Sequence, residues 1–182
     1  MKVPDSFEDD FSSERIILFP LTEENMSPSY PDWLNDPHVN QFLLGDRSRQ
    51  TKKSCRVFIH DCQARPDVLL LGIRTSLQGR PAHVGNVKFS TIRTDHKTAE
   101  IGLLIGEKSL WGKGLGRKAL QDAQLIARRF LTLRKLTAGI LATNEASQRT
   151  FSHAGFTTIG VRQGQFLLDG RPEDEILMET FV

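Results

Sequence analysis

Three glycines at alternate positions, Gly112, Gly114 and Gly116, lie within the stretch Trp-Gly-Lys-Gly-Leu-Gly. This stretch joins an apolar run at 99–106 to a segment at 114–133 whose apolar residues recur every three or four positions. The first turn of a helix carries unpaired N–H groups and the positive end of the helix dipole, and glycine lets a ligand approach the backbone closely. The joint therefore predicts a phosphate site, with a turn that binds nothing as the plain alternative.

Two common nucleotide motifs do not fit this joint. The P-loop pattern G-x-x-x-x-G-K-[ST] does not occur in the sequence. A dinucleotide fingerprint built on Gly114, Gly116 and Ala119 would need an acidic residue about 20 positions further on and a second half-domain. The region near Gly139 has no acid before Glu145, and too little chain follows.

Basic residues gather around the joint and along the helix that follows it. They are interpreted either as a solvated helix face or as a rim for phosphate groups. Lys113 and Arg117 lie nearest the glycines, and the cluster comprises Lys108, Lys113, Arg117, Lys118, Arg128, Arg129, Arg134 and Lys135.

The segments after the joint complete a longer pattern. A second apolar strand at 136–142 precedes Asn144, and a short helix then ends at Gly155-Phe156. In this order and spacing the chain resembles the GNAT superfamily of N-acetyltransferases over about residues 13–181. Most GNAT proteins begin the glycine loop with Gln or Arg, where this chain has Trp111.

Three segments resemble one branch of that superfamily, the Rim-type ribosomal-protein acetyltransferases. They are the run Trp-Leu-Asn-Asp-Pro-His-Val at 33–39, the Trp-Gly-Lys-Gly loop, and the closing segment at 169–178.

The resemblance implies acetyl-coenzyme A as co-substrate. The five histidines show no i,i+4 metal pairing with carboxylates, so we expect no metal site. The resemblance places the backbone of the strand before the joint beside the thioester and the pantetheine arm, and the glycine joint around the pyrophosphate. The residues that it assigns to the coenzyme are Leu103, Leu104, Ile105, Trp111, Gly112, Lys113, Gly114, Leu115, Gly116, Arg117, Asn144 and Phe151.

The reaction implied is direct attack of a primary amine on the thioester. A lysine ammonium with a pKa of about 10.4 is mostly protonated at neutral pH, so such an acceptor needs a base. Glu100 is the candidate base, because a partly buried carboxylate gains basicity; its alternative role is a hydrogen bond to a loop or to the acceptor. Phe151 stands where many GNAT enzymes have a Tyr acid, and Ser147 is the candidate in its place; its alternative role is that of an ordinary Ser in the first turn of a helix.

By the same resemblance, Tyr30, Trp33, Asp36 and Phe42 lie where the family builds the acceptor wall. An aromatic and carboxylate set would suit a cationic amine or a sugar face, while anchoring of short helices to the core is the alternative interpretation. The acceptor, a small molecule or a peptide, remains open among a protein N-terminus, an amino sugar on a nucleotide, and a small amine such as an aminoglycoside.

The composition predicts one soluble globular domain over residues 1–182, with 1–12 as a loose arm. The chain is 38% hydrophobic and 25% charged, and it has neither an apolar run of membrane-spanning length nor a signal peptide, so we expect a cytoplasmic protein without a membrane partner. A net charge of +2 argues against nucleic-acid binding. We expect Cys55 and Cys62 to be reduced thiols.

The predicted elements are a strand at 16–19, short helices over 30–44 broken at Pro31 and Pro37, a helix at 51–64, a hairpin turning at Gln78-Gly79, the strand and helix that flank the joint, and a final hairpin around Asp169-Gly170. This order predicts an α/β (α+β) fold of the GNAT kind, a mixed and mostly antiparallel sheet with flanking helices.

Two alternatives to an enzyme remain at this point. An acetyl-coenzyme A sensor would bind the coenzyme without transfer, a role motivated by Phe151 in place of an acid. An interaction protein would form a homodimer through a sheet edge, although intact Gly114, Gly116 and Asn144 argue against it.

Overall fold

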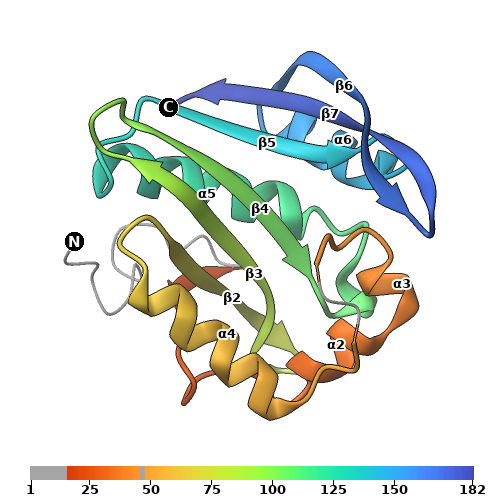
Figure 1. Ribbon diagram of the computed structural model, residues 1–182. Coiled ribbons are helices and arrows are strands. Elements are labelled where there is room, and N and C mark those ends of the chain that lie inside the picture. The colour runs from red at the N-terminus through yellow and green to blue at the C-terminus, as the bar shows by residue number, and fades with distance from the viewer. Residues whose placement is uncertain (1–15, 46–47) are drawn as a thin grey trace.

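The computed structural model describes residues 16–45 and 48–182, so the arm predicted at 1–12 lies outside the described residues. Seven strands form one sheet in the order β1-β2-β3-β4-β5-β7-β6, with helices on both faces (Figure 1). Every neighbouring pair is antiparallel except β4 and β5. The predicted fold class is confirmed.

The element bounds follow the predicted order. The strands are β1 (Ile17–Pro20), β2 (Leu69–Leu77), β3 (Arg80–Arg93), β4 (Thr98–Ile105), β5 (Lys135–Leu141), β6 (Thr157–Leu168) and β7 (Arg171–Phe181). The helices are α2 (Tyr30–Asn35), α3 (Pro37–Asn40), α4 (Lys52–Ala64), the short 3-10 helix η1 (Lys108–Leu110), α5 (Leu115–Arg129) and α6 (Glu145–His153). Within the described residues, no helix is long and apolar enough to cross a membrane.

Local turn and cap residues fix several of these bounds. Gln78 and Gly79 have φ of 51° and 77°, and Asp169 and Gly170 have φ of 50° and 77°, so both predicted hairpins turn on two left-handed residues. Thr51 caps α4 by accepting a hydrogen bond from the backbone N–H of the third helical residue.

Two predicted helix bounds are wrong. Pro31 does not break a helix but lies in the first turn of α2, where proline fits. The helix α5 ends at Arg129 rather than at residue 133. After it, Thr132 takes a φ of 50° and the Leu133 N–H donates to the Ala127 carbonyl, a turn that leaves the Leu133 side chain in the core.

The sheet separates two hydrophobic clusters. The larger lies between the sheet and α5, where Leu120 and Ile126 are fully buried. The smaller lies under α2 and α4 and contains both free cysteines, Cys55 and Cys62. These clusters hold β4 at the centre of the molecule, with one face toward each set of helices.

The strands β4 and β5 part soon after they meet. Their parallel ladder contains the pairs Thr98↔Lys135, Ala99↔Leu136 and Glu100↔Thr137. Beyond Glu100, β4 continues to Ile105 beside β3, whereas β5 continues beside β7, and the two strands diverge (Figure 1). The parting leaves a wedge in which the β5-facing backbone groups of 103–105 have no partner strand among the described residues.

The β3–β4 ladder predicts that an added Cβ lowers stability at one glycine and has little effect at another. A Cβ at Gly85 would collide with the Leu104 carbonyl of the neighbouring strand, whereas a Cβ at Gly102 meets nothing within 4 Å. Gly85→Ala should therefore lower the free energy of unfolding by about 2 kcal/mol. Gly102→Ala, the matched control, should change it by less than about 0.5 kcal/mol. Urea unfolding measures both, and equal stability of the two variants would contradict the described register.

Candidate functional site

The wedge opens toward both faces of the sheet, because successive side chains of β4 point to opposite faces. Leu103 and Ile105 pack toward the larger core under α5, while Leu104 packs against the smaller core under α2 and α4. The backbone between them is therefore reached from both sides: the glycine joint lies on the α5 side, and a cavity lies on the other.

The glycine joint has the conformation that an anion site needs. Gly112 and Gly114 have φ of 72° and 79°, and Gly114 precedes α5 without any side-chain cap. The Lys118 N–H is bonded to the Gly114 carbonyl. The N–H groups of 115–117, in the first turn, precede that bond and have no acceptor within the helix. The predicted joint of strand, loop and helix is confirmed as a structure, while its ligand remains a prediction.

Trp111 anchors this loop to the end of β4. Its indole Nε1 donates a hydrogen bond to the Ile105 carbonyl over 2.8 Å, although the residue stays 44% exposed. A second tie comes from Lys108, which forms an ion pair with Asp36 at the start of α3. Trp111 thus provides a side-chain anchor at the first position of the glycine loop.

The basic cluster around the joint divides into free and paired charges. Lys113 and Arg117 are exposed, and neither forms an ion pair with a described residue. Lys118 is instead paired with Asp122, whose side chain is buried on α5. Burial raises the pKa of Asp122 against the opposing effect of Lys118. Two of the predicted basic residues therefore remain available to an anion at the joint.

The helix α6 packs beside the joint. The Asn144 side chain caps this helix by accepting a hydrogen bond from the Ser147 N–H over 3.1 Å. Thr150 lies beside Gly116, and Ser147, one turn earlier, shares its side of the helix. Phe151 points the other way: it is 2% exposed and packs edge-on against Phe156, with ring centroids 5.0 Å apart. Its ring belongs to the core and is closed to a ligand.

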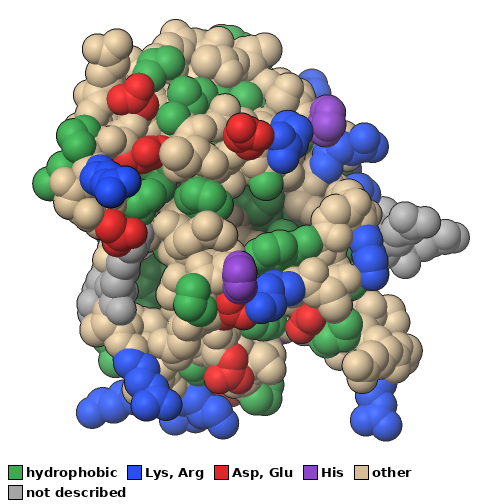
Figure 2. Space-filling view, turned by 90° about the vertical axis from the view of Figure 1, so that its right-hand side faces the viewer, with side chains coloured by type: hydrophobic (Ala, Val, Ile, Leu, Met, Phe, Trp, Pro, Cys, Tyr) green, Lys and Arg blue, Asp and Glu red, His purple; other side chains and the backbone are tan. Residues whose placement is uncertain are grey.

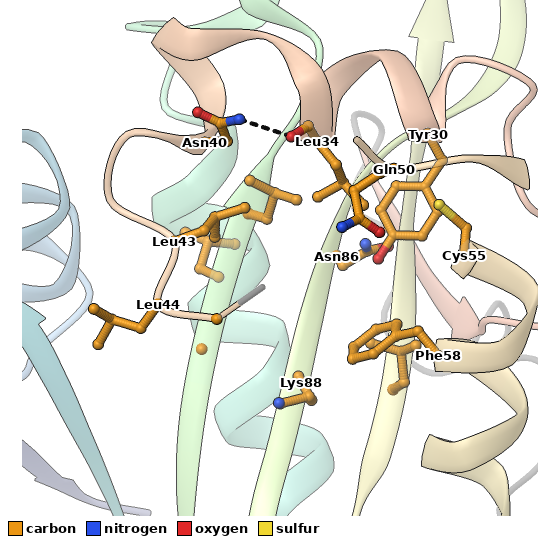
Figure 3. A pocket seen from close by; sticks show the side chains of 15 residues that line it. Tyr30, Leu34, Asn40, Leu43, Leu44, Gln50, Cys55, Phe58, Asn86 and Lys88 are labelled. Carbon is orange, nitrogen blue, oxygen red and sulfur yellow. Dashed lines mark hydrogen bonds between the residues drawn. The ribbon is translucent and has the colours of Figure 1, made fainter. Parts of the chain in front are cut away.

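A cavity of about 500 Å³ lies on the other face of β4, below α2 and beside α4. Figure 3 shows the side chains that converge on it from these helices and from the sheet. On the face of the molecule drawn in Figure 2, hydrophobic side chains lie in recesses between scattered charges of both signs. The lining is mainly apolar and consists of Tyr30, Leu34, Asn40, Leu43, Leu44, Gly45, Gln50, Cys55, Phe58, Leu70, Asn86, Lys88, Gly102, Leu103 and Leu104.

A buried polar chain supports the inner end of this cavity. The Ser27 N–H donates to His83 Nδ1 over 3.0 Å, so the proton of the neutral ring is on Nε2. The Nε2 proton lies between two acceptors, the Gly85 carbonyl and the Asn86 Oδ1, each 2.8 Å from Nε2. Sequence reasoning missed His83 and Asn86, although polar residues inside an apolar strand were the available signal.

Among the four predicted acceptor residues, the structure places Tyr30 in the cavity lining and the others outside it. Trp33 is buried against Gly106 and His83, and its ring centroid lies 5.3 Å from that of His83. Asp36 accepts a hydrogen bond from the His38 N–H and pairs with Lys108. Trp33 and Asp36 therefore anchor the short helices α2 and α3, as the alternative interpretation expected. Phe42 is half-buried near the cavity but does not line it.

Glu100 stands at the last pair of the β4–β5 ladder, opposite Ser90 of β3. The partial burial expected for its carboxylate is absent, because the side chain is exposed and lies beyond the cavity lining. The argument that burial raises its basicity therefore fails. A role through water at the narrow end of the wedge is compatible with its place.

Comparisons with known proteins agree with this architecture. A family model described as an acetyltransferase (GNAT) domain matches residues 15–157. An N-acetyltransferase 9-like protein of Nematostella vectensis is 28% identical over 151 residues, which are 80% of this chain and 76% of that protein. The structure of spermidine N-acetyltransferase from Vibrio cholerae with CoA and spermine has a TM-score of 0.80 at 16% identity, over 93% of this chain and 96% of that one. Microcin C7 self-immunity acetyltransferase MccE, with acetyl-CoA and AMP, has a TM-score of 0.78 at 21% identity, over 93% and 94%.

The buried neutral ring of His83 predicts a pH-dependent stability. Burial lowers the pKa of folded His83, so below about pH 6.5 the unfolded chain binds a proton that the folded chain does not. As the pH is lowered through this range, the free energy of unfolding should therefore decrease. This group contributes up to about 1.4 kcal/mol per pH unit, until the pH reaches the pKa of folded His83. Urea unfolding between about pH 7.5 and pH 5 measures the slope. His83→Gln should lose this component, and an identical slope in both proteins would contradict it.

Proposed function

This chain belongs to the acetyltransferase (GNAT) domain family, and we propose that it transfers an acetyl group from acetyl-coenzyme A to a primary amine. One observation carries the proposal: the wedge at 103–105 touches the glycine joint on one face of the sheet and the cavity on the other. A thioester held in the wedge would meet an amine held in the cavity.

The coenzyme is proposed to lie along the wedge with its pyrophosphate at the glycine joint. The first-turn N–H groups of α5 would receive the phosphate oxygens, with Lys113 and Arg117 adding charge at the rim. The pantetheine arm carries amide groups that can pair with the free backbone groups of β4, as a neighbouring strand would. Asn144 caps α6, and Ser147 in its first turn shares a side of the helix with Thr150, which lies beside Gly116; both are proposed to border this path.

The chemical step is proposed to depend on backbone groups more than on side chains. The tetrahedral intermediate places negative charge on the former carbonyl oxygen, and the N–H groups of Leu103 and Ile105, which alternate toward β5, are the donors in reach of the wedge. A thiol with a pKa of about 8.5 is a tolerable leaving group, so a weak acid such as Ser147 suffices. Glu100 is proposed to take the amine proton through water.

The proposed branch of the family and the proposed acceptor class rest on likeness to other proteins. The segments at 33–39 and 111–114 support membership of the Rim-type branch, and the family match over 15–157 supports a single acetyltransferase domain. The neighbour solved with spermine acts on a polyamine, which supports a small amine among the acceptors.

The function is tested by mixing the purified protein with acetyl-coenzyme A and a panel of amines, with release of free thiol as the readout. We expect thiol release with one class of amine and none without an amine. Gly114→Val should weaken acetyl-coenzyme A binding at least about tenfold in calorimetry, because a β-branched residue is strained at a φ of 79°.

Gly79→Val is the matched control for this variant. Gly79 has a φ of 77° in the β2–β3 turn, and a Cβ at either glycine would meet nothing within 4 Å. The control therefore carries the same backbone strain away from the joint and should keep its affinity. Equal affinity in the Gly114 variant would contradict the phosphate site, and binding without thiol release for every amine would contradict acetyl transfer.

A further inference from the structure

We propose that Lys88 makes the cavity selective for primary amines that carry a carboxylate. This inference rests on the proposed function of the cavity as the acceptor site. It departs from the expected aromatic and carboxylate wall, because the described lining contains a cation and no acidic side chain.

Lys88 occupies the floor of the cavity. It lies on β3 directly opposite Gly102 of β4, next to the backbone proposed to hold the thioester. The side chain is half-buried, and its Nζ lies 5.8 Å from the centre of the Phe58 ring on α4 (Figure 3). The ammonium is thus held between the sheet and α4, within the volume that an acceptor would fill.

The charge of Lys88 has no counterion among the described residues. No described Asp or Glu forms an ion pair with it, and the other polar side chains of the lining are the neutral Tyr30, Asn40, Gln50 and Asn86. Glu100 shares this face of the sheet two residues from Gly102, but it is exposed and outside the lining. A half-buried charge in a mainly apolar cavity favours an anionic ligand.

The same charge acts differently on the two ends of an acceptor. A carboxylate at the far end would pair with the Lys88 ammonium, whereas the second ammonium of a polyamine would be repelled. The reacting amine would also lose its proton more readily near a positive charge, since a like charge disfavours the protonated form. The favoured acceptor is therefore a small amino acid with separated amine and carboxylate, of a size that about 500 Å³ accommodates.

The test compares ligands that differ only at the far end. Propyl to hexyl chains carrying one amine are used with a carboxylate, a methyl group or a second amine as the tail, titrated calorimetrically into the protein with and without coenzyme A. We expect the carboxylate series to bind at least about tenfold more tightly than either other series. The same chemistry could come from the N-terminus of a peptide. Dipeptides with Asp or Asn as the second residue test this source, because they differ in a side-chain carboxylate.

Three variants at this position identify the origin of the preference. Lys88→Arg should keep it, Lys88→Met should abolish it, and Lys88→Glu should reverse it in favour of the diamines. Lys53→Met, which removes an exposed lysine of α4 outside the lining, should leave it unchanged.

Equal binding of the three series, absence of binding by all of them, or a carboxylate preference that survives Lys88→Met would overturn the inference. Thiol release decides the proposed function separately. The titrations do not depend on turnover, so an enzyme that transfers acetyl groups without this preference refutes only the role of Lys88.

Discussion

The parting of β4 from β5 is the constraint on which the rest of the molecule depends. A parallel pair that stops at Glu100↔Thr137 leaves backbone donors and acceptors unpaired in the middle of a seven-stranded sheet. Such groups are costly unless water or a ligand satisfies them. Beyond this point β4 stays paired with β3 and β5 with β7, so each strand follows a different neighbour.

Both candidate subsites follow from where β4 ends and which way its side chains point. The chain leaves Ile105, passes Trp111, and enters α5 through two left-handed glycines, so the open helix end lies at the mouth of the wedge. Trp111 holds this geometry through the Ile105 carbonyl. On the opposite face, Leu104 and Gly102 share the cavity with Lys88 and Asn86 from β3. One strand therefore positions both the proposed coenzyme site and the proposed acceptor site.

Local signals in the sequence predicted the parts of the structure that local chemistry determines. Asp169-Gly170 and Gln78-Gly79 specify turns, and the spacing of the glycines specifies the joint. The roles of Asp36 and Trp33 depend on partners far along the chain, Lys108 and Gly106, which no local pattern reveals. The sequence did not identify Lys88 as a cavity residue either, because its place in the lining depends on how Phe58 of α4 lies over the sheet.

Amide hydrogen exchange with and without acetyl-coenzyme A tests the central claim most directly. If the coenzyme pairs with the free edge of β4, exchange should slow at the backbone amides of 103–105 that face β5 and at those of 112–117, while the β2–β3 turn stays unchanged. Exchange at 103–105 that is unaffected by bound acetyl-coenzyme A would contradict the account, because the coenzyme would then lie outside the wedge.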